Sequence, residues 1–131
     1  MKYYTLDELI QLSKDYCYEE KELPIFFSEG NKYTRIVISK DEHLEVVIIC
    51  FAPGQTSTIH NHQGSNCVVK VIRGKIMETL FKDNGDHLEK ISSHYIDKDE
   101  VSGLDGVAIH QISNVSKDGT ILINFYSPPF A

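Results

Sequence analysis

The spacing of apolar residues near the start of the chain predicts an amphipathic helix over residues 5–19. One face of this helix would carry mostly apolar and small side chains, at intervals of three and four residues: Leu6, Leu9, Ile10, Ser13 and Cys17. Thr5 and Glu8 have the spacing of a capping box, in which each side chain accepts a hydrogen bond from the other residue's backbone amide. We therefore expect the apolar face to pack on whatever follows, with Cys17 as a buried core thiol.

The pattern becomes strand-like after residue 30. Seven short runs rich in β-branched and aromatic residues cover 33–39, 44–51, 66–72, 75–81, 87–96, 107–115 and 120–126. Turn sequences containing glycine separate several of them. Many short strands after one helix indicate a mainly β protein, an antiparallel sandwich or barrel. We predict a single domain over residues 1–131, in which a helical segment (1–30) packs on a β-barrel (31–131).

Composition and charge narrow the range of functions. The chain has 131 residues, of which 41% are hydrophobic and 24% charged, so it can bury a core without structural metal. A bound metal would then be functional. The net charge of −6 and the lack of a Lys/Arg run argue against a nucleic-acid partner. No apolar run approaches the length of a membrane span, so we expect no membrane partner.

The three cysteines are Cys17, Cys50 and Cys67. An odd, sparse set without a signal peptide at the N-terminus is typical of a reducing compartment. These features predict a cytoplasmic location.

Residues 54–74 contain the most informative group of potential metal ligands in the sequence. His60 and His62 are separated by one residue, so on a strand their side chains would point the same way and could bind one metal. His110 lies in a later strand-like run. The plainer interpretations are that His60 and His62 are a chance pair on the surface and that His110 is a histidine of the core. The spacing favours metal ligands for all three.

The glycines around these histidines resemble the cupin signature. Gly54 lies six residues before His60, Gly74 lies seven after Cys67, and Asn114 follows His110 by four. This resemblance implies a cupin fold, a double-stranded β-helix or jelly-roll-like barrel with a metal in its mouth. Cys67 stands where cupins usually carry a glutamate ligand. Three neutral imidazoles would leave the full charge on the metal and favour an anionic ligand such as a thiolate.

A wider set of motifs is similar to one cupin family, the cysteine dioxygenases of type I, from about residue 32 to residue 130. The shared motifs are Lys-Tyr-Thr-Arg (32–35), Ser-Thr-Ile-His-Asn-His (57–62), Cys67, Gly-Lys-Ile-Met-Glu-Thr-Leu-Phe (74–81), Ile-His-Gln-Ile-Ser-Asn-Val-Ser (109–116) and Tyr-Ser-Pro-Pro-Phe (126–130). The resemblance implies an oxidoreductase that uses iron(II) and O2 to convert L-cysteine to cysteine sulfinate. It also implies a monomer.

The same resemblance implies a role for each site residue. His60, His62 and His110 would hold the iron, although nickel, zinc or copper could occupy the site after purification. Arg35 would bind the substrate carboxylate, with Tyr33 beside it. Cys67 and Tyr126 would form the thioether bond that many members carry, and a cis Ser127-Pro128 bond is expected next to Tyr126. From the residues alone, Arg35 could be a solvated strand residue and Cys67 and Tyr126 ordinary core side chains.

Three positions depart from the family pattern. Leu122 and Asn124 replace the serine and histidine that usually precede the tyrosine on the last strand, and Phe51 replaces a tryptophan of the pocket wall. Asn124 can still form a hydrogen bond to Tyr126, but it cannot titrate near neutral pH. These departures keep two alternatives open: oxidation of another small thiol, such as 3-mercaptopropionate, and a non-catalytic cupin that binds a metal or ligand.

Overall fold

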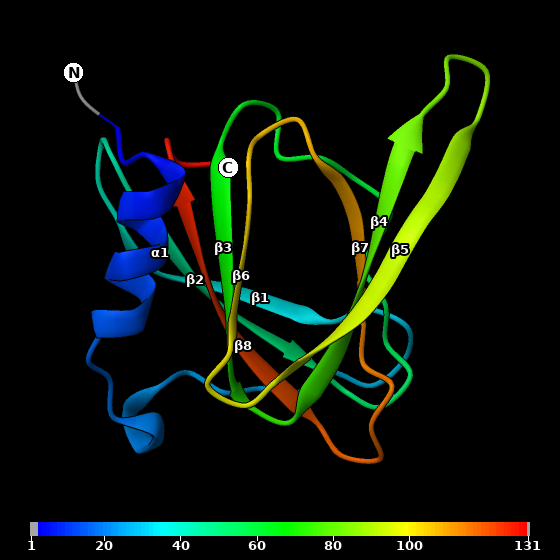
Figure 1. Ribbon diagram of the computed structural model, residues 1–131. Coiled ribbons are helices and arrows are strands. Elements are labelled where there is room, and N and C mark those ends of the chain that lie inside the picture. The colour runs from blue at the N-terminus through cyan, green and yellow to red at the C-terminus, as the bar shows by residue number, and fades with distance from the viewer. Residues whose placement is uncertain (1–2, 131) are drawn as a thin grey trace.

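The computed structural model describes residues 3–130, which form a two-sheet β-sandwich with one helix on its outside (Figure 1). The helical elements are α1 (Leu6–Asp15) and a short 3-10 helix, η1 (Glu20–Glu22). The strands are β1 (Thr34–Lys40), β2 (Glu45–Phe51), β3 (Asn66–Arg73), β4 (Lys75–Asp83), β5 (Leu88–Asp97), β6 (Val101–Leu104), β7 (Ile109–Ser113) and β8 (Thr120–Ser127). The prediction of a mainly β fold is confirmed.

The strands form one five-stranded sheet, in the order β1-β2-β8-β3-β6, and one three-stranded sheet, in the order β5-β4-β7. Every pairing is antiparallel. Figure 1 shows the two sheets facing each other across an interior. Such an arrangement places alternate side chains of every strand inside the sandwich.

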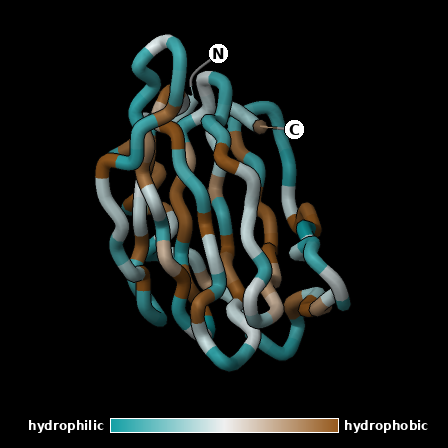
Figure 2. The backbone as a smooth tube through the Cα atoms, turned by 90° about the vertical axis from the view of Figure 1, so that its right-hand side faces the viewer, coloured by the Kyte–Doolittle hydropathy of each residue, from teal (hydrophilic) through white to brown (hydrophobic). Residues whose placement is uncertain are grey.

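The core has two parts because the larger sheet is covered on both faces. One cluster lies between the sheets and includes Val47, Val71, Ile76 and Leu122. The other lies between the larger sheet and the N-terminal segment and is built around Leu9 and Phe125. All residues of β2 and β8 are therefore buried, which explains why these strands are largely apolar on both faces. The hydropathy pattern is visible in Figure 2, where apolar stretches lie along the strands.

The N-terminal helix is confirmed, with a shorter extent than predicted. Thr5 caps it, and the reciprocal hydrogen bonds between Thr5 and Glu8 form the expected capping box. The helix ends at Asp15 rather than 19, because Tyr16 adopts an extended conformation. Cys17 consequently leaves the apolar face. The prediction of a buried Cys17 was wrong, since its thiol is exposed.

Strand β6 was not predicted. It contains four residues, one of them Gly103, and follows directly on the turn at Asp97–Glu100. The strand forms because its backbone pairs with β3, from Lys70 opposite Val101 to Cys67 opposite Leu104. Tertiary pairing therefore overrides a sequence with little strand character of its own.

Candidate metal centre

The fold brings the three predicted histidine ligands together from two distant segments. His60 and His62 lie in the connection between β2 and β3, and His110 lies in β7. An isolated antiparallel bridge joins them: the His60 amide donates to the His110 carbonyl at 3.0 Å, and the His110 amide donates to the His60 carbonyl at 2.9 Å. One coordinating atom from each of the three side chains lies within 4.8 Å of the others.

The three rings surround a common point. Their centroids are 4.7 to 5.0 Å apart, and their planes cross at 65° to 86°. Nε2 of His110 and Nε2 of His62 are 3.3 Å apart. This separation allows the Nε2 atoms of His62 and His110 to bind a single ion at normal bond lengths of about 2.0–2.2 Å.

The outer ring nitrogens fix two of the three rings in a metal-binding form. His60 Nδ1 lies 2.8 Å from the Thr58 carbonyl oxygen, and His110 Nδ1 lies 2.8 Å from Oε2 of Glu78. Both oxygens can only accept, so each Nδ1 carries the hydrogen and each Nε2 keeps its lone pair for a metal. Within residues 3–130, the buried Nδ1 of His62 has no hydrogen-bond partner.

Burial favours the neutral form of His60 and His62, which is the form that binds a metal. Burial lowers the pKa of His62 to about 3, and the neighbouring His110 and His60 add to this effect. Burial also lowers the pKa of His60. The cluster of three imidazoles therefore fits a divalent metal ion.

A cavity of about 240 Å³ opens beside the histidines and contains the other predicted site residues except Cys67. Its walls are formed by Tyr33, Arg35, Ile49, Phe51, Ser57, Thr58, His60, Asn61, His62, Gln63, His110, Ile112, Leu122, Asn124, Tyr126 and Phe130. The rings of Tyr33 and Phe51 stack at 4.7 Å and form one wall. The volume suits a small molecule of amino-acid size.

Arg35 supplies the cavity's positive charge. It lies on β1 with its side chain 30% exposed, and its guanidinium is 5.7 Å from the centre of the Tyr126 ring. A buried carboxylate, Glu45, forms an ion pair with it at 3.7 Å and also accepts the backbone amide of Phe130 at 3.0 Å. Glu45 therefore connects the arginine to the C-terminal segment.

Cys67 and Tyr126 are direct partners in the β3–β8 ladder, and both are buried. Burial raises the pKa of the Cys67 thiol, as does the charge of Glu78, while a hydrogen bond with Tyr126 acts in the opposite direction. Burial likewise raises the pKa of the Tyr126 hydroxyl. Asn124 Nδ2 donates to this hydroxyl at 3.0 Å, which is the hydrogen bond that the sequence predicted. Leu122 contributes an apolar side chain to the cavity wall.

The Ser127-Pro128 bond is cis, as predicted. The segment that follows places Phe130 against the site. Its ring stacks on Tyr126 at 5.4 Å and meets the edge of His62 at 5.3 Å. Phe130 therefore forms an apolar wall beside the histidine cluster.

Three residues next to the site were not assigned a role from the sequence: Glu45, Glu78 and Phe130. A sequence signal existed for the two acids. Glu78 is in phase with the inward-facing Ile76, and Glu45 is in phase with the inward-facing Val47. A carboxylate on the buried face of a strand requires partners, and this marks it as a residue of interest.

Solved structures share the fold at low sequence identity. The TT1209 protein of Thermus thermophilus matches with a TM-score of 0.70 and 18% identity, over 86% of this chain and 96% of that one. The Cnp3 cupin domain of Schizosaccharomyces pombe matches with a TM-score of 0.64 and 14% identity, over 81% of this chain and 66% of that one. The fold is therefore that of the cupins.

Relatives in sequence point to a narrower group. Cysteine dioxygenase type 1 of Rattus norvegicus is 31% identical over 109 residues, and the Homo sapiens protein is 28% identical over 105. Each match covers 76% of this chain and 52% of the relative, so the chain spans about half the length of these relatives. Among residues 3–130, no helix is long and apolar enough to cross a membrane.

The family model for cysteine dioxygenase type I matches residues 2–131, which is nearly the whole chain. The histidine cluster, the adjoining cavity and the paired Cys67 and Tyr126 lie within this match. The chain belongs to the cysteine dioxygenase type I family.

Proposed function

We propose that the protein is an iron(II)-dependent thiol dioxygenase that oxidises L-cysteine to cysteine sulfinate. The reaction adds both atoms of O2 to the sulfur, so that R–SH and O2 give R–SO2H. The observation that carries this proposal is one cavity lined by three clustered histidines, Arg35 and Tyr126. The chemistry that iron(II) supplies in such a site is the activation of O2 toward a thiolate.

The residues around the cavity would bind the metal and orient the substrate. His60, His62 and His110 would hold the metal through the nitrogens that face the cavity. Arg35 would bind the substrate carboxylate, because a guanidinium offers several donors in a fixed plane. Tyr33 and Phe51 would form the wall against the rest of the substrate. These contacts would orient a small amino acid with its thiol toward the metal.

Tyr126 would stay protonated at neutral pH, since burial raises the pKa of its hydroxyl. The hydroxyl would then serve as a hydrogen-bond donor inside the cavity, with Asn124 donating to its oxygen from the other side. Asn124 positions this hydroxyl without exchanging a proton near neutral pH.

The direct test is O2 consumption by iron-loaded protein with three thiols: L-cysteine, 3-mercaptopropionate and cysteamine, which lacks a carboxylate. We expect L-cysteine to be oxidised and its sulfinate to form in proportion to O2. Arg35→Gln should lower kcat/KM for L-cysteine by roughly 30- to 150-fold, the equivalent of about 2–3 kcal/mol for a charge-assisted contact.

Arg73 provides a matched control, because it lies on β3 outside the cavity lining and is 53% exposed. Arg73→Gln should leave kcat/KM unchanged. Cysteamine oxidation should be nearly insensitive to Arg35→Gln. If no thiol is consumed by protein that elemental analysis shows to be loaded with iron, the dioxygenase proposal is wrong.

A second candidate is a dioxygenase for a different small thiol, and the residues around Tyr126 favour it. Leu122 and Asn124 line the cavity where the family pattern has a serine and a histidine, so the side chain bonded to Tyr126 does not titrate near neutral pH. The same thiol panel separates the candidates, since a higher kcat/KM for 3-mercaptopropionate than for L-cysteine would reverse the assignment.

A further inference from the structure

Glu78 is a charged residue in the interior of the sandwich. It lies in the middle of β4, opposite His94 of β5 on one side and Ile112 of β7 on the other. Its side chain is buried. A buried carboxylate is costly unless it is hydrogen-bonded, so its surroundings should show what it does.

Two side chains donate hydrogen bonds to this carboxylate, and a third lies beside it. His110 Nδ1 reaches Oε2 at 2.8 Å and Ser102 Oγ reaches Oε1 at 2.7 Å, while His94 Nε2 lies 2.9 Å from Oε1. Glu78 therefore accepts a hydrogen bond on each of its two oxygens, from Ser102 on Oε1 and from His110 on Oε2.

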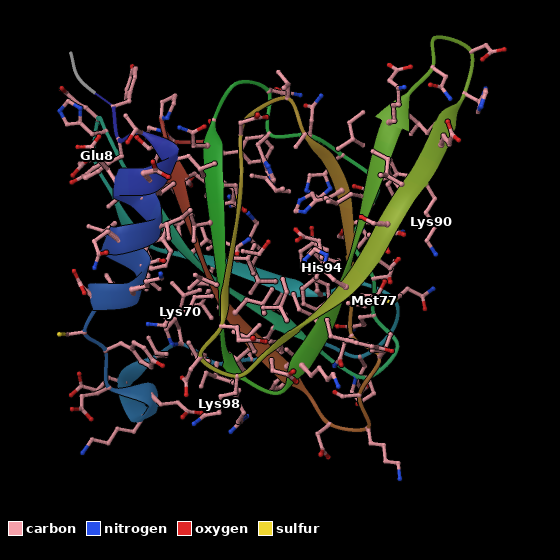
Figure 3. All side chains as sticks on the ribbon, viewed as in Figure 1. Glu8, Lys70, Met77, Lys90, His94 and Lys98 are labelled. Carbon is pink, nitrogen blue, oxygen red and sulfur yellow. The ribbon has the colours of Figure 1, made fainter. Side chains whose placement is uncertain are left out.

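The three neighbouring side chains come from different parts of the molecule. His110 belongs to the histidine cluster, Ser102 belongs to β6 at the edge of the larger sheet, and His94 belongs to the edge strand β5 of the smaller sheet. The His94 side chain is 43% exposed. In Figure 3 it lies toward the inside of the sandwich, whereas Lys90 on the same strand points away. The Glu78 carboxylate therefore lies between the partly exposed His94 and the buried His110.

We propose that Glu78 is a positioning residue of the metal centre, which directs Nε2 of His110 at the metal. The inference rests on the proposed metal centre and extends it. Cys67 leaves the centre without the carboxylate ligand of other cupins, and Glu78 places a carboxylate one residue further out.

A hydrogen-bond count predicts the effect of Glu78→Gln. Glutamine keeps the shape but has a single acceptor oxygen, and its NH2 group can only donate. With the oxygen facing His94 and Ser102, the NH2 group faces His110 Nδ1. His110 then changes to the form with its hydrogen on Nε2, which blocks the nitrogen that would bind the metal.

The first test reads the ring hydrogen of His110 in metal-free protein by 15N NMR of the histidine side chains. We expect the Nδ1–H form in the wild type and the Nε2–H form in Glu78→Gln. A wild-type His110 in the Nε2–H form overturns the proposal, and this measurement needs no variant.

The second test is Zn²⁺ affinity, measured by competition with a chelator. Glu78→Gln should weaken Zn²⁺ binding by roughly 10- to 100-fold. Ser102→Ala is the matched control, because it removes another donor to the same carboxylate, and a contact between the sheets, without touching His110. It should change Zn²⁺ affinity by less than about threefold, and Glu78→Asp should recover part of the loss.

The outcomes separate this proposal from the proposed function. Unchanged Zn²⁺ affinity in folded Glu78→Gln protein, or an equal loss in Ser102→Ala, overturns the positioning role whether or not a thiol is oxidised. A loss confined to the Glu78 variants supports it even if the wild type oxidises no thiol.

Discussion

At the scale of single residues, the site has a cysteine, Cys67, in place of a carboxylate ligand and two buried carboxylates nearby, Glu78 and Glu45. Cys67, which by resemblance stands where cupins usually carry a glutamate, lies opposite Tyr126 in the ladder. Glu78 approaches from β4 and binds His110, and Glu45 approaches from β2 and pairs with Arg35. Each buried acid has a cation or a histidine as a neighbour, so each fixes the orientation of one residue proposed to bind metal or substrate.

The family resemblance implies a thioether bond between Cys67 and Tyr126, and their partnership in the ladder brings the two side chains close enough for us to expect it after turnover. Its formation removes one hydrogen from each side chain, and O2 is the oxidant that accepts them. Intact-protein mass spectrometry should show the loss of two hydrogen atoms in protein incubated with iron, O2 and L-cysteine.

Cys67→Ser should abolish that mass change. Cys50→Ser is the control, since Cys50 is equally buried but belongs to the cluster on the other face of the larger sheet. A mass loss that persists in Cys67→Ser, or disappears in Cys50→Ser, would assign the bond to other residues.

At the scale of elements, the site depends on how closely two connections approach each other. The connection that carries His62 passes the one that leads into β7 and His110, and the Gly64 amide donates to the Gly106 carbonyl at 3.2 Å. A Cβ atom at position 106 would lie 2.3 Å from the Gly64 backbone carbon. Gly106 is therefore needed for its small size, which allows the two histidine-bearing segments to meet.

Gly106→Ala should push these segments apart, because backbone cannot yield as a side chain can. We expect a loss of about 3 kcal/mol in the free energy of unfolding, at the upper end for overpacking, together with weaker Zn²⁺ binding. Urea unfolding and chelator competition measure the two effects.

Gly103→Ala is the matched control in the neighbouring strand. Its Cβ would lie 2.9 Å from the end of the flexible Ile10 side chain, which can move aside. It should cost about 1 kcal/mol and leave Zn²⁺ affinity unchanged. Equal effects of the two alanines would show that the Gly64–Gly106 contact does not position the histidines.

At the scale of the whole molecule, folding encloses the site between two sheets, with the larger sheet covered by the N-terminal segment. Lys70 illustrates how that segment is held: it is mostly buried, and its Nζ donates to the Ser13 carbonyl in the last turn of α1 at 2.9 Å. In Figure 1, α1 lies on the opposite side of the larger sheet from the smaller one. Folding buries the Cys67 thiol, so the ionisation of this thiol is coupled to the free energy of unfolding of the whole protein.

That link predicts a loss of stability at alkaline pH. Burial raises the pKa of the folded Cys67 thiol above its ordinary value of 9.0. The folded state then holds its proton while the unfolded chain releases it, so the contribution of the thiol is complete below pH 9 and falls as the pH rises. The loss is about 1.4 kcal/mol per pH unit above that value.

Urea unfolding of freshly reduced, metal-free protein at about pH 8 and about pH 10.5 measures this effect. Serine does not ionise, so the stability advantage of the wild type over Cys67→Ser should shrink by about 2 kcal/mol between the two pH values. A constant difference between the wild type and Cys67→Ser over this pH range would contradict the linkage.

Features that depend on local spacing could be predicted from the sequence. The capping box at Thr5, the histidines of the metal cluster and the strand runs follow from neighbours a few residues apart, whose geometry the backbone period fixes. The sequence was therefore sufficient to predict a mainly β fold, the histidine cluster and the family. The division into one domain over 1–131 stays a prediction.

Contacts between distant residues became visible only in the folded chain. Glu78 lies 32 positions before His110, and Glu45 lies 85 positions before Phe130, so no local period relates them. Strand β6 exists through its pairing with β3, and Cys17 left the core because the helix ended at Asp15. Such contacts follow from sheet register and packing, which arise only when the whole chain has folded, and they supply the charges around the three histidines.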